Sequence, residues 1–102
     1  MASFVTIRPD QVKDQVCSSQ AVTTTASAAL PKSANPRYVE LSTRSNYVYL
    51  SVRKTVTASN GVRVGTGVDQ KGWYVPAGVA IYAVCEQGTV VLDLVVWEIT
   101  NA

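Results

Sequence analysis

The residue types that most often carry out catalysis are scarce in this chain of 102 residues. It contains no histidine, which excludes Ser-His-Asp and Cys-His catalysis and removes the commonest zinc ligand. A carboxylate pair for glycoside hydrolysis would have to come from Asp10, Asp14, Glu40, Asp69, Glu86, Asp93 and Glu98. We therefore predict that the protein is not an enzyme and has no catalytic residue, cofactor or metal.

Asp93 stands out among the carboxylates because it interrupts the apolar run Val90 to Val96. A charged residue in such a run is rarely buried without a partner. We predict that Asp93 is solvated or ion-paired at an edge or interface, in preference to a catalytic role.

Two further motifs suggest ligand binding at first sight. Gly65 to Gly72 looks like a phosphate-binding loop, but Gln70 stands where GxGxxG has its third glycine and no helical pattern follows. We predict an ordinary loop there.

Trp73 and Tyr74, directly after that loop, could stack on a sugar or a base. An aromatic pair in a small β-protein is more often a core anchor or a protein-interface residue.

Charge, apolar runs and cysteine spacing argue against nucleic-acid binding, membrane insertion, secretion and a CxxC site. The net charge is +2, and the nine basic residues are mostly single, so we expect no nucleic-acid partner. No apolar run approaches the roughly 18 residues of a membrane-spanning helix, and the first eight residues do not resemble a secretory signal. Cys17 and Cys85 form no CxxC motif, and we expect two buried free thiols in preference to a disulfide.

The elements that would position these residues are predicted to be strands. Valine occurs eighteen times and threonine ten times, a bias toward residues that suit pleated surfaces. Alternation and turn residues predict strands over Tyr38 to Thr43, Tyr47 to Arg53, Val79 to Cys85 and Thr89 to Ile99. Ala21 to Leu30 could be a strand or a helix, and its threonines favour a strand. Asn60-Gly61 predicts a type I′ hairpin that joins Thr55–Ala58 to Val62–Val64.

The fold class that follows is all-β. About eight short strands predict one domain over residues 1–102, a small antiparallel β-sandwich or barrel, jelly-roll-like. Residues 1–20 are a possible N-terminal arm within it, in which Val12 and Val16 are spaced for one short helical turn.

The last two predicted strands are apolar on both faces. Val79, Ile81, Ala83 and Cys85 oppose Ala80, Tyr82 and Val84, and the strand after Thr89 follows the same pattern. A thin sandwich leaves the outer face of each sheet in water, so the second apolar face would be covered either by a partner or by loops of the same chain. We expect partner contacts.

The N-terminal segment Ala2 to Arg8 alternates weakly and precedes Pro9. We expect it to add a strand to a neighbour's sheet, with the alternative that it is the first strand of its own sheet.

Several segments together resemble small virion proteins of tailed bacteriophages, which are head decoration (cement) proteins or minor structural proteins. The resemblance covers Arg37 to Glu98 and is carried by the Arg37 to Thr43 strand, Asn46 to Leu50, Val56 to Val64, Gly78 to Val84, Gly88-Thr89 and Trp97-Glu98. The chain departs from that pattern in the longer, aromatic segment Asp69 to Pro76. The resemblance implies no catalytic residues.

The resemblance implies a capsid decoration protein that oligomerises, as a dimer or trimer, and binds the major capsid protein on the virion surface after synthesis in the host cytoplasm. The alternatives are a tail, neck or fibre component of the virion and, from another class, a carbohydrate-binding module. We expect neither membrane nor nucleic-acid binding. The candidate partner contacts are Phe4, Ile7, Arg8, Trp73, Tyr74, Tyr82 and Trp97.

Overall fold

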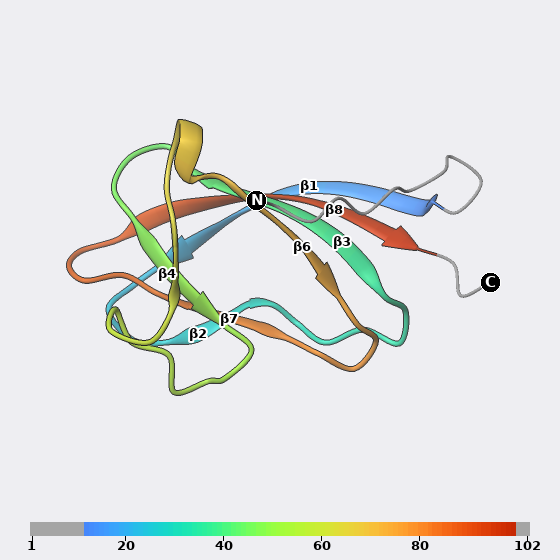
Figure 1. Ribbon diagram of the computed structural model, residues 1–102, viewed down its shortest axis with the longest axis horizontal. Coiled ribbons are helices and arrows are strands. Elements are labelled where there is room, and N and C mark those ends of the chain that lie inside the picture. Colours follow the sequence, from blue (N-terminus) through green and yellow to red (C-terminus); the bar gives the residue numbers. More distant parts are fainter. Residues whose placement is uncertain (1–11, 100–102) are drawn as a thin grey trace.

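The computed structural model describes residues 12–99, which form a sandwich of two antiparallel four-stranded sheets (Figure 1). Sheet A has the strand order β1-β8-β3-β6, and sheet B has the order β2-β7-β4-β5. The strands are β1 (Val12–Val22), β2 (Ser27–Leu30), β3 (Arg37–Thr43), β4 (Val48–Ser51), β5 (Val62–Val64), β6 (Lys71–Val75), β7 (Ile81–Val84) and β8 (Val90–Ile99), and the 3-10 turn η2 (Gly67–Asp69) lies between β5 and β6.

The pairing of the strands is that of a jelly roll. β1 pairs with β8, β2 with β7, β3 with β6 and β4 with β5, as in one long hairpin. The β3–β8 and β4–β7 pairs then roll that hairpin into two facing sheets. The predicted all-β sandwich of jelly-roll type is confirmed.

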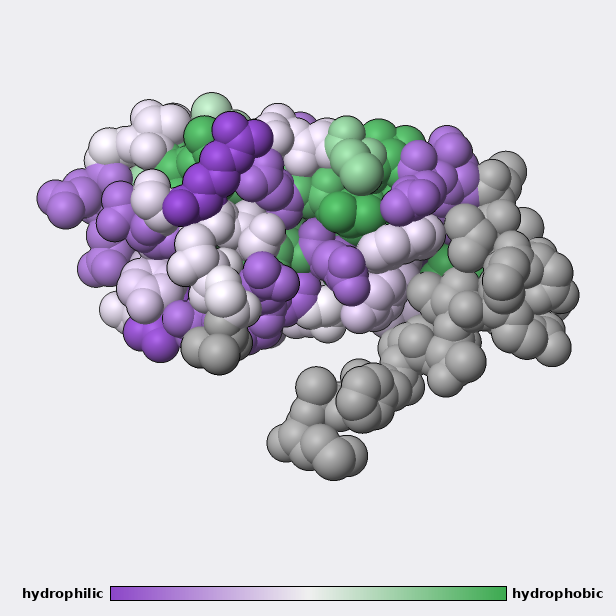
Figure 2. Space-filling view, turned by 90° about the horizontal axis from the view of Figure 1, so that it is seen from above, coloured by the Kyte–Doolittle hydropathy of each residue, from purple (hydrophilic) through white to green (hydrophobic). Residues whose placement is uncertain are grey.

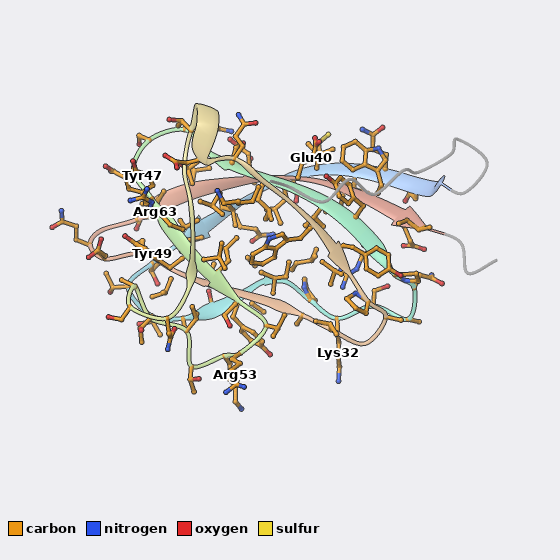
Figure 3. All side chains as sticks on the ribbon, viewed as in Figure 1. Lys32, Glu40, Tyr47, Tyr49, Arg53 and Arg63 are labelled. Atoms are coloured by element: carbon orange, nitrogen blue, oxygen red, sulfur yellow. The ribbon has the colours of Figure 1, made fainter. Side chains whose placement is uncertain are left out.

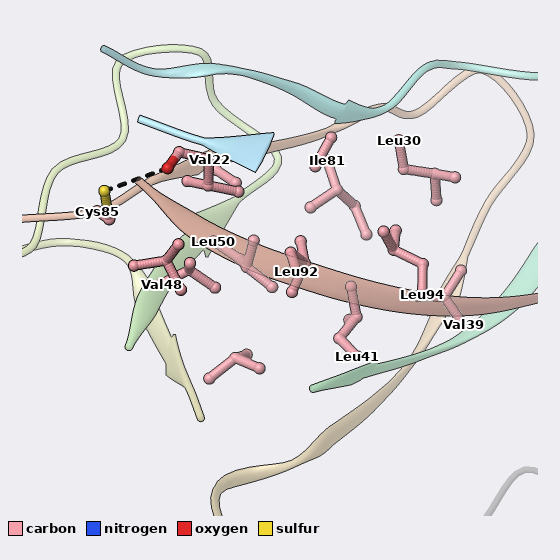
Figure 4. Close-up of a cluster of buried hydrophobic side chains, with 14 of the residues drawn as sticks. Val22, Leu30, Val39, Leu41, Val48, Leu50, Ile81, Cys85, Leu92 and Leu94 are labelled. Carbon is pink, nitrogen blue, oxygen red and sulfur yellow. Dashed lines mark hydrogen bonds between the residues drawn. The ribbon is translucent and has the colours of Figure 1, made fainter. Parts of the chain in front are cut away.

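Alternate residues of the strands face the space between the sheets and fill it with aliphatic side chains. On sheet A these include Val39, Leu41, Leu92 and Leu94, and on sheet B Val48, Leu50, Ile81 and Ala83 (Figure 4). All are at most 1% exposed. Their burial fixes the register of both sheets, because a slip of one residue would turn each set toward solvent.

The strands over β3, β4, β7 and β8 agree with the predictions within a few residues. The segment Ala21 to Leu30 is extended, as favoured, but Thr23 to Ala26 break it into the end of β1 and the start of β2. Residues 12–20, suggested as part of an arm or helical turn, instead lie in β1 and pair with β8. β6 was missed, because Gly72 and the aromatic residues beside it hide its alternation.

The predicted Asn60-Gly61 hairpin is wrong. Thr55–Ala58 is not a strand, and neither Asn60 nor Gly61 has a positive φ. Instead, Asn60 Oδ1 accepts a hydrogen bond from the Thr57 backbone N–H at 2.7 Å, which closes a local turn. Val56 in this loop is 4% exposed, and a Cβ at Gly61 would come within 2.8 Å of both Val56 Cγ2 and Tyr49 Cβ.

Within residues 12–99, no helix is long and apolar enough to cross a membrane.

Candidate protein-interaction surface

The outer face of sheet A carries a row of three aromatic residues from three neighbouring strands. Tyr38 on β3 is the register partner of Trp97 on β8 and of Tyr74 on β6. Register partners in antiparallel strands lie on the same face, so the three side chains form one row across the sheet. Tyr74 is 50% exposed, and Tyr38 and Trp97 are half-buried. We call Tyr38, Tyr74 and Trp97 the aromatic row.

The aromatic row is packed against its own sheet. The Tyr38 and Trp97 ring centroids lie 5.8 Å apart with the planes tilted by 38°, within the range of favourable aromatic pairs. Gly72 on β6 makes room for Tyr38, because a Cβ at position 72 would collide with the Tyr38 hydroxyl. The row is therefore held in place without being covered.

Apolar side chains continue from the row along β1 and β8. Val95 is the register partner of Cys17, and Val91 is the partner of Ala21. Cys17 and Ala21 are exposed, and Val91 and Val95 are half-buried. Figure 2, which looks onto this side of the molecule, shows apolar side chains gathered in patches between polar ones. Glu40 also projects from this face, away from sheet B (Figure 3).

An ion-pair network divides the apolar surface. Arg44 donates to both carboxylate oxygens of Asp93 at 3.1 Å, and the Ser19 hydroxyl donates to Asp93 Oδ1 at 2.7 Å. The hydrogen bonds from Arg44 and then from Ser19 lower the pKa of Asp93 below its ordinary value. The predicted ion pairing of Asp93 is confirmed, but Asp93 lies on the outer face of β8, which is a central strand of sheet A and not an edge strand.

β1 is one of the two edge strands of sheet A and, among the described residues, has no strand neighbour on its outer side. Every residue from Asp14 to Ala21 is exposed, so this part of the strand is open on both faces as well as along its edge. Val16, whose partner is Val96, is 49% exposed. We call residues 14–22 the β1 edge.

Of the predicted contact residues that lie within residues 12–99, the structure brings two together. Tyr74 and Trp97 share the aromatic row, whereas Trp73 points the opposite way and packs against the core. Tyr82 is half-buried on β7, in sheet B, beside Ser51 and Ala28. Phe4, Ile7 and Arg8, with the strand expected over Ala2 to Arg8, lie outside the described residues. Tyr38 was not among the predicted contact residues. The alternation within Arg37–Thr43 indicated only that its side chain lies on the face of the strand opposite to that of Val39.

The stacking platform expected for a carbohydrate-binding module is contradicted. Trp73 and Tyr74 are successive residues of β6, so their side chains lie on opposite faces of sheet A. Trp73 contacts buried core residues, and Tyr74 lies in solvent. The two rings cannot bind one sugar together.

The outward-facing apolar side chains of β7 and β8 differ in how far the chain itself covers them. On β7, Val84 is 7% exposed although it faces outward, so the chain itself shields it. On β8, the outward Val91, Val95 and Trp97 stay half-buried. The chain itself therefore covers Val84, whereas the outward residues of β8 keep exposed area that is available for contact with a partner.

A second polar cluster lies at the end of sheet B (Figure 3). The Arg63 guanidinium carbon lies 4.5 Å from the centre of the Tyr47 ring, and Arg63 pairs with Asp69 at 3.7 Å. The Tyr49 hydroxyl donates to Glu86 Oε1 at 2.8 Å, which raises the pKa of Tyr49. A hollow of about 110 Å³ beside Tyr47 and Glu86 is smaller than the roughly 300 Å³ of small-molecule sites.

Both cysteines are free, and they differ in exposure. Cys85 is 4% exposed, and its Sγ lies 3.3 Å from the Val22 carbonyl oxygen (Figure 4). Cys17 is exposed on the outer face of sheet A, so the prediction that both thiols are buried is wrong for Cys17. Over residues 12–99, no three His, Cys, Asp or Glu side chains gather as metal ligands would.

Comparison with known proteins adds information on the fold alone. No family model matches the chain, and no curated protein matches it. A solved structure of Bacillus endospore appendages, described as a novel family of disulfide-linked pili, is similar with a TM-score of 0.52 and 15% sequence identity. The match covers 97% of this chain and 100% of that chain.

Proposed function

We propose that this protein is a structural subunit that works by binding other proteins, specifically a head decoration protein of a tailed bacteriophage that binds major capsid subunits. The observation that carries the proposal is the uncovered aromatic row beside exposed apolar residues on sheet A. Tyr and Trp are enriched in protein interfaces, where a large apolar ring and one polar group can both be satisfied. The sequence resemblance over Arg37 to Glu98 supplies the class of particle.

Such a role requires shape and exposed contact area and no reacting group. Each copy needs only modest affinity, because copies that are linked to one another bind a repetitive surface with high effective concentration. The outer face of sheet A, with Tyr38, Tyr74 and Trp97 at one end, is the surface that we assign to the capsid. The protein would then lie on the outside of the phage head.

Binding to purified heads assembled without this protein tests the proposal. The wild-type chain should co-sediment with such heads in many copies per head. The Tyr74→Ala/Trp97→Ala double variant should bind on the order of a thousandfold more weakly, as expected if each interface aromatic contributes about 2 kcal/mol and the two losses add. Tyr82→Ala, on the opposite sheet, is the matched control and should bind like wild type. Equal binding by all three would exclude the aromatic row as the contact.

A second candidate is a subunit of a fibre, either a tail or fibre component of the virion or a pilus-like appendage. Two observations favour it: the fold is shared with a protein of disulfide-linked pili, and Cys17 is exposed on an edge strand. Electron microscopy of the concentrated protein separates the candidates. Filaments would support the fibre, whereas discrete small oligomers that bind heads would support decoration.

A further inference from the structure

We propose that the β1 edge pairs, antiparallel and about a two-fold axis, with the β1 edge of a second copy of this chain. Sheet A of each copy would then continue into sheet A of the other. This proposal rests on the structural role proposed above and deepens it, because it names the strand through which copies associate.

The β1 edge has the features of an edge strand that can pair with a strand of another chain. It is open on both faces from Asp14 to Ala21, and within residues 12–99 no strand other than β8 pairs with it. Proteins usually protect such an edge with charges, proline or a bulge in mid-strand. From Gln15 to Val22 the strand has no charged residue, no proline and no glycine, and its register irregularity lies before Asp14. Nothing in this stretch opposes the addition of a strand.

A second β1 fits this edge better than the other edges of the fold. The remaining edge strands β2, β5 and β6 have four, three and five residues, so they would leave much of the eleven-residue β1 unpaired. Two identical strands related by a two-fold axis pair over their whole regular length. The regular stretch Asp14–Val22 is centred on Ser18, and we place the axis there.

This register is compatible with the chemistry of each face. Pairing about Ser18 keeps outward residues opposite outward residues, so the outer face of one sheet A continues that of the other. Asp14, the charged residue of the stretch, lies opposite Val22 of the second copy and not opposite its own image, which avoids like-charge repulsion. The two Cys17 side chains become diagonal neighbours across the axis, with Cβ atoms about 7–8 Å apart or less.

A charge-exchange experiment tests the pairing. The wild-type chain should be a dimer by light scattering. Ser18→Lys and Ser18→Glu should each halve the measured mass, because like charges meet at the axis, and an equimolar mixture of the two should regain the dimer mass. Thr24→Lys, in the exposed turn after β1, adds the same charge off the strand and should stay dimeric. Recovery in the mixture shows that the variants are folded.

Cross-linking through Cys17 gives an independent readout. A short bismaleimide should link two full-length chains through Cys17, and Cys17→Ser should abolish the linked species while Cys85→Ser should not. A wild-type chain that is monomeric, a dimer that survives Ser18→Lys, or a mixture that stays monomeric would overturn the proposal. A monomer that still binds heads would overturn only this pairing, whereas a charge-switchable dimer without head binding would overturn only the proposed function.

Discussion

Gly72 lies directly beneath the hydroxyl of Tyr38, so close that a Cβ at position 72 would collide with it. Gly72 lies inside β6, an edge strand. A glycine at such a position weakens the strand because of its conformational freedom. Its benefit is the space that it leaves for the Tyr38 side chain, whose ring packs against Trp97. The aromatic row therefore depends on a residue without a side chain.

We expect Gly72→Val to displace Tyr38 while the fold is retained. The colliding atom is the far end of a side chain at the surface, which can rotate away, and valine favours strands. The variant should keep its unfolding temperature to within a few degrees but lose the Tyr38–Trp97 contact, seen as a change in near-ultraviolet circular dichroism, and bind heads more weakly. An unchanged near-ultraviolet spectrum would contradict this geometry. Tyr38→Phe is the control, since it removes only the hydroxyl.

How far the sequence predicts this fold depends on the kind of signal. Alternation in Val48 to Ser51 and in Arg37 to Thr43 predicts strands, because burial of one face imposes a period of two. The β4–β5 connection was mispredicted, because Asn60-Gly61 is a strong local signal for a hairpin but Asn60 closes a turn onto Thr57 instead. The same residue type thus serves a different local turn, and a Cβ at the following Gly61 would come within 2.8 Å of Val56 Cγ2 in that loop.

The candidate surface was less predictable than the fold. The aromatic row joins residues 38, 74 and 97, which become neighbours only through the β3–β6 and β3–β8 registers. Sequence patterns report which face a residue takes within one strand, but the order of strands in the sheet decides which faces meet. Trp73 and Tyr74 illustrate what could be predicted, since successive strand residues must point in opposite directions.

The two cysteines should differ in reactivity. Cys17 is exposed, whereas Cys85 is 4% exposed with its Sγ against the Val22 carbonyl. We expect DTNB to titrate one thiol per native chain and two in denaturant, with Cys17→Ser leaving none in the native state. Rapid reaction of two thiols in the native protein would show that the sandwich opens at Cys85.

The Asp93 network should make stability sensitive to acid. Hydrogen bonds from Arg44 and Ser19 lower the pKa of Asp93 below 3.8, so the folded state holds fewer protons there than the unfolded state. The resulting stability is present above the unfolded pKa and is lost as the pH falls through the folded pKa. Asp93→Asn should therefore unfold at a lower temperature than wild type at pH 7, and the difference should shrink below pH 4. Ser19→Ala should retain most of the pH dependence, because the Arg44 pair remains. A difference independent of pH would contradict this account.

Tyr49 should ionise later than an ordinary tyrosine. Its hydroxyl donates to Glu86 at 2.8 Å, which favours the protonated phenol and raises the pKa of Tyr49 above 10.0. A raised pKa contributes stability that is present below the unfolded pKa and disappears as the pH rises through the folded pKa. Absorbance titration should show a late ionisation that is missing in Tyr49→Phe and shifted to lower pH in Glu86→Ala. An unchanged titration of Glu86→Ala would show that the hydrogen bond does not hold the proton.

Arg37 is a buried charge whose removal should not weaken the fold if its shape is kept. It is 5% exposed, its Nη2 donates to the Val79 carbonyl at 3.0 Å, and its Nε has no hydrogen-bond partner among the described residues. Burial lowers the pKa of Arg37, which the nearby Glu98 opposes. An unsatisfied buried N–H costs about 1–3 kcal/mol, so an apolar side chain of similar length can replace a buried ion at little cost.

Arg37→Met should therefore have a free energy of unfolding within about 1 kcal/mol of wild type or above it. Arg37→Ala leaves the space unfilled and should lose about 2 kcal/mol or more, by analogy with other large-to-small core substitutions. Urea unfolding of both variants with a common m-value measures the difference. Because the two variants remove the same charge, their difference isolates packing, and an equal loss in both would show that the guanidinium itself stabilises this end of the sandwich.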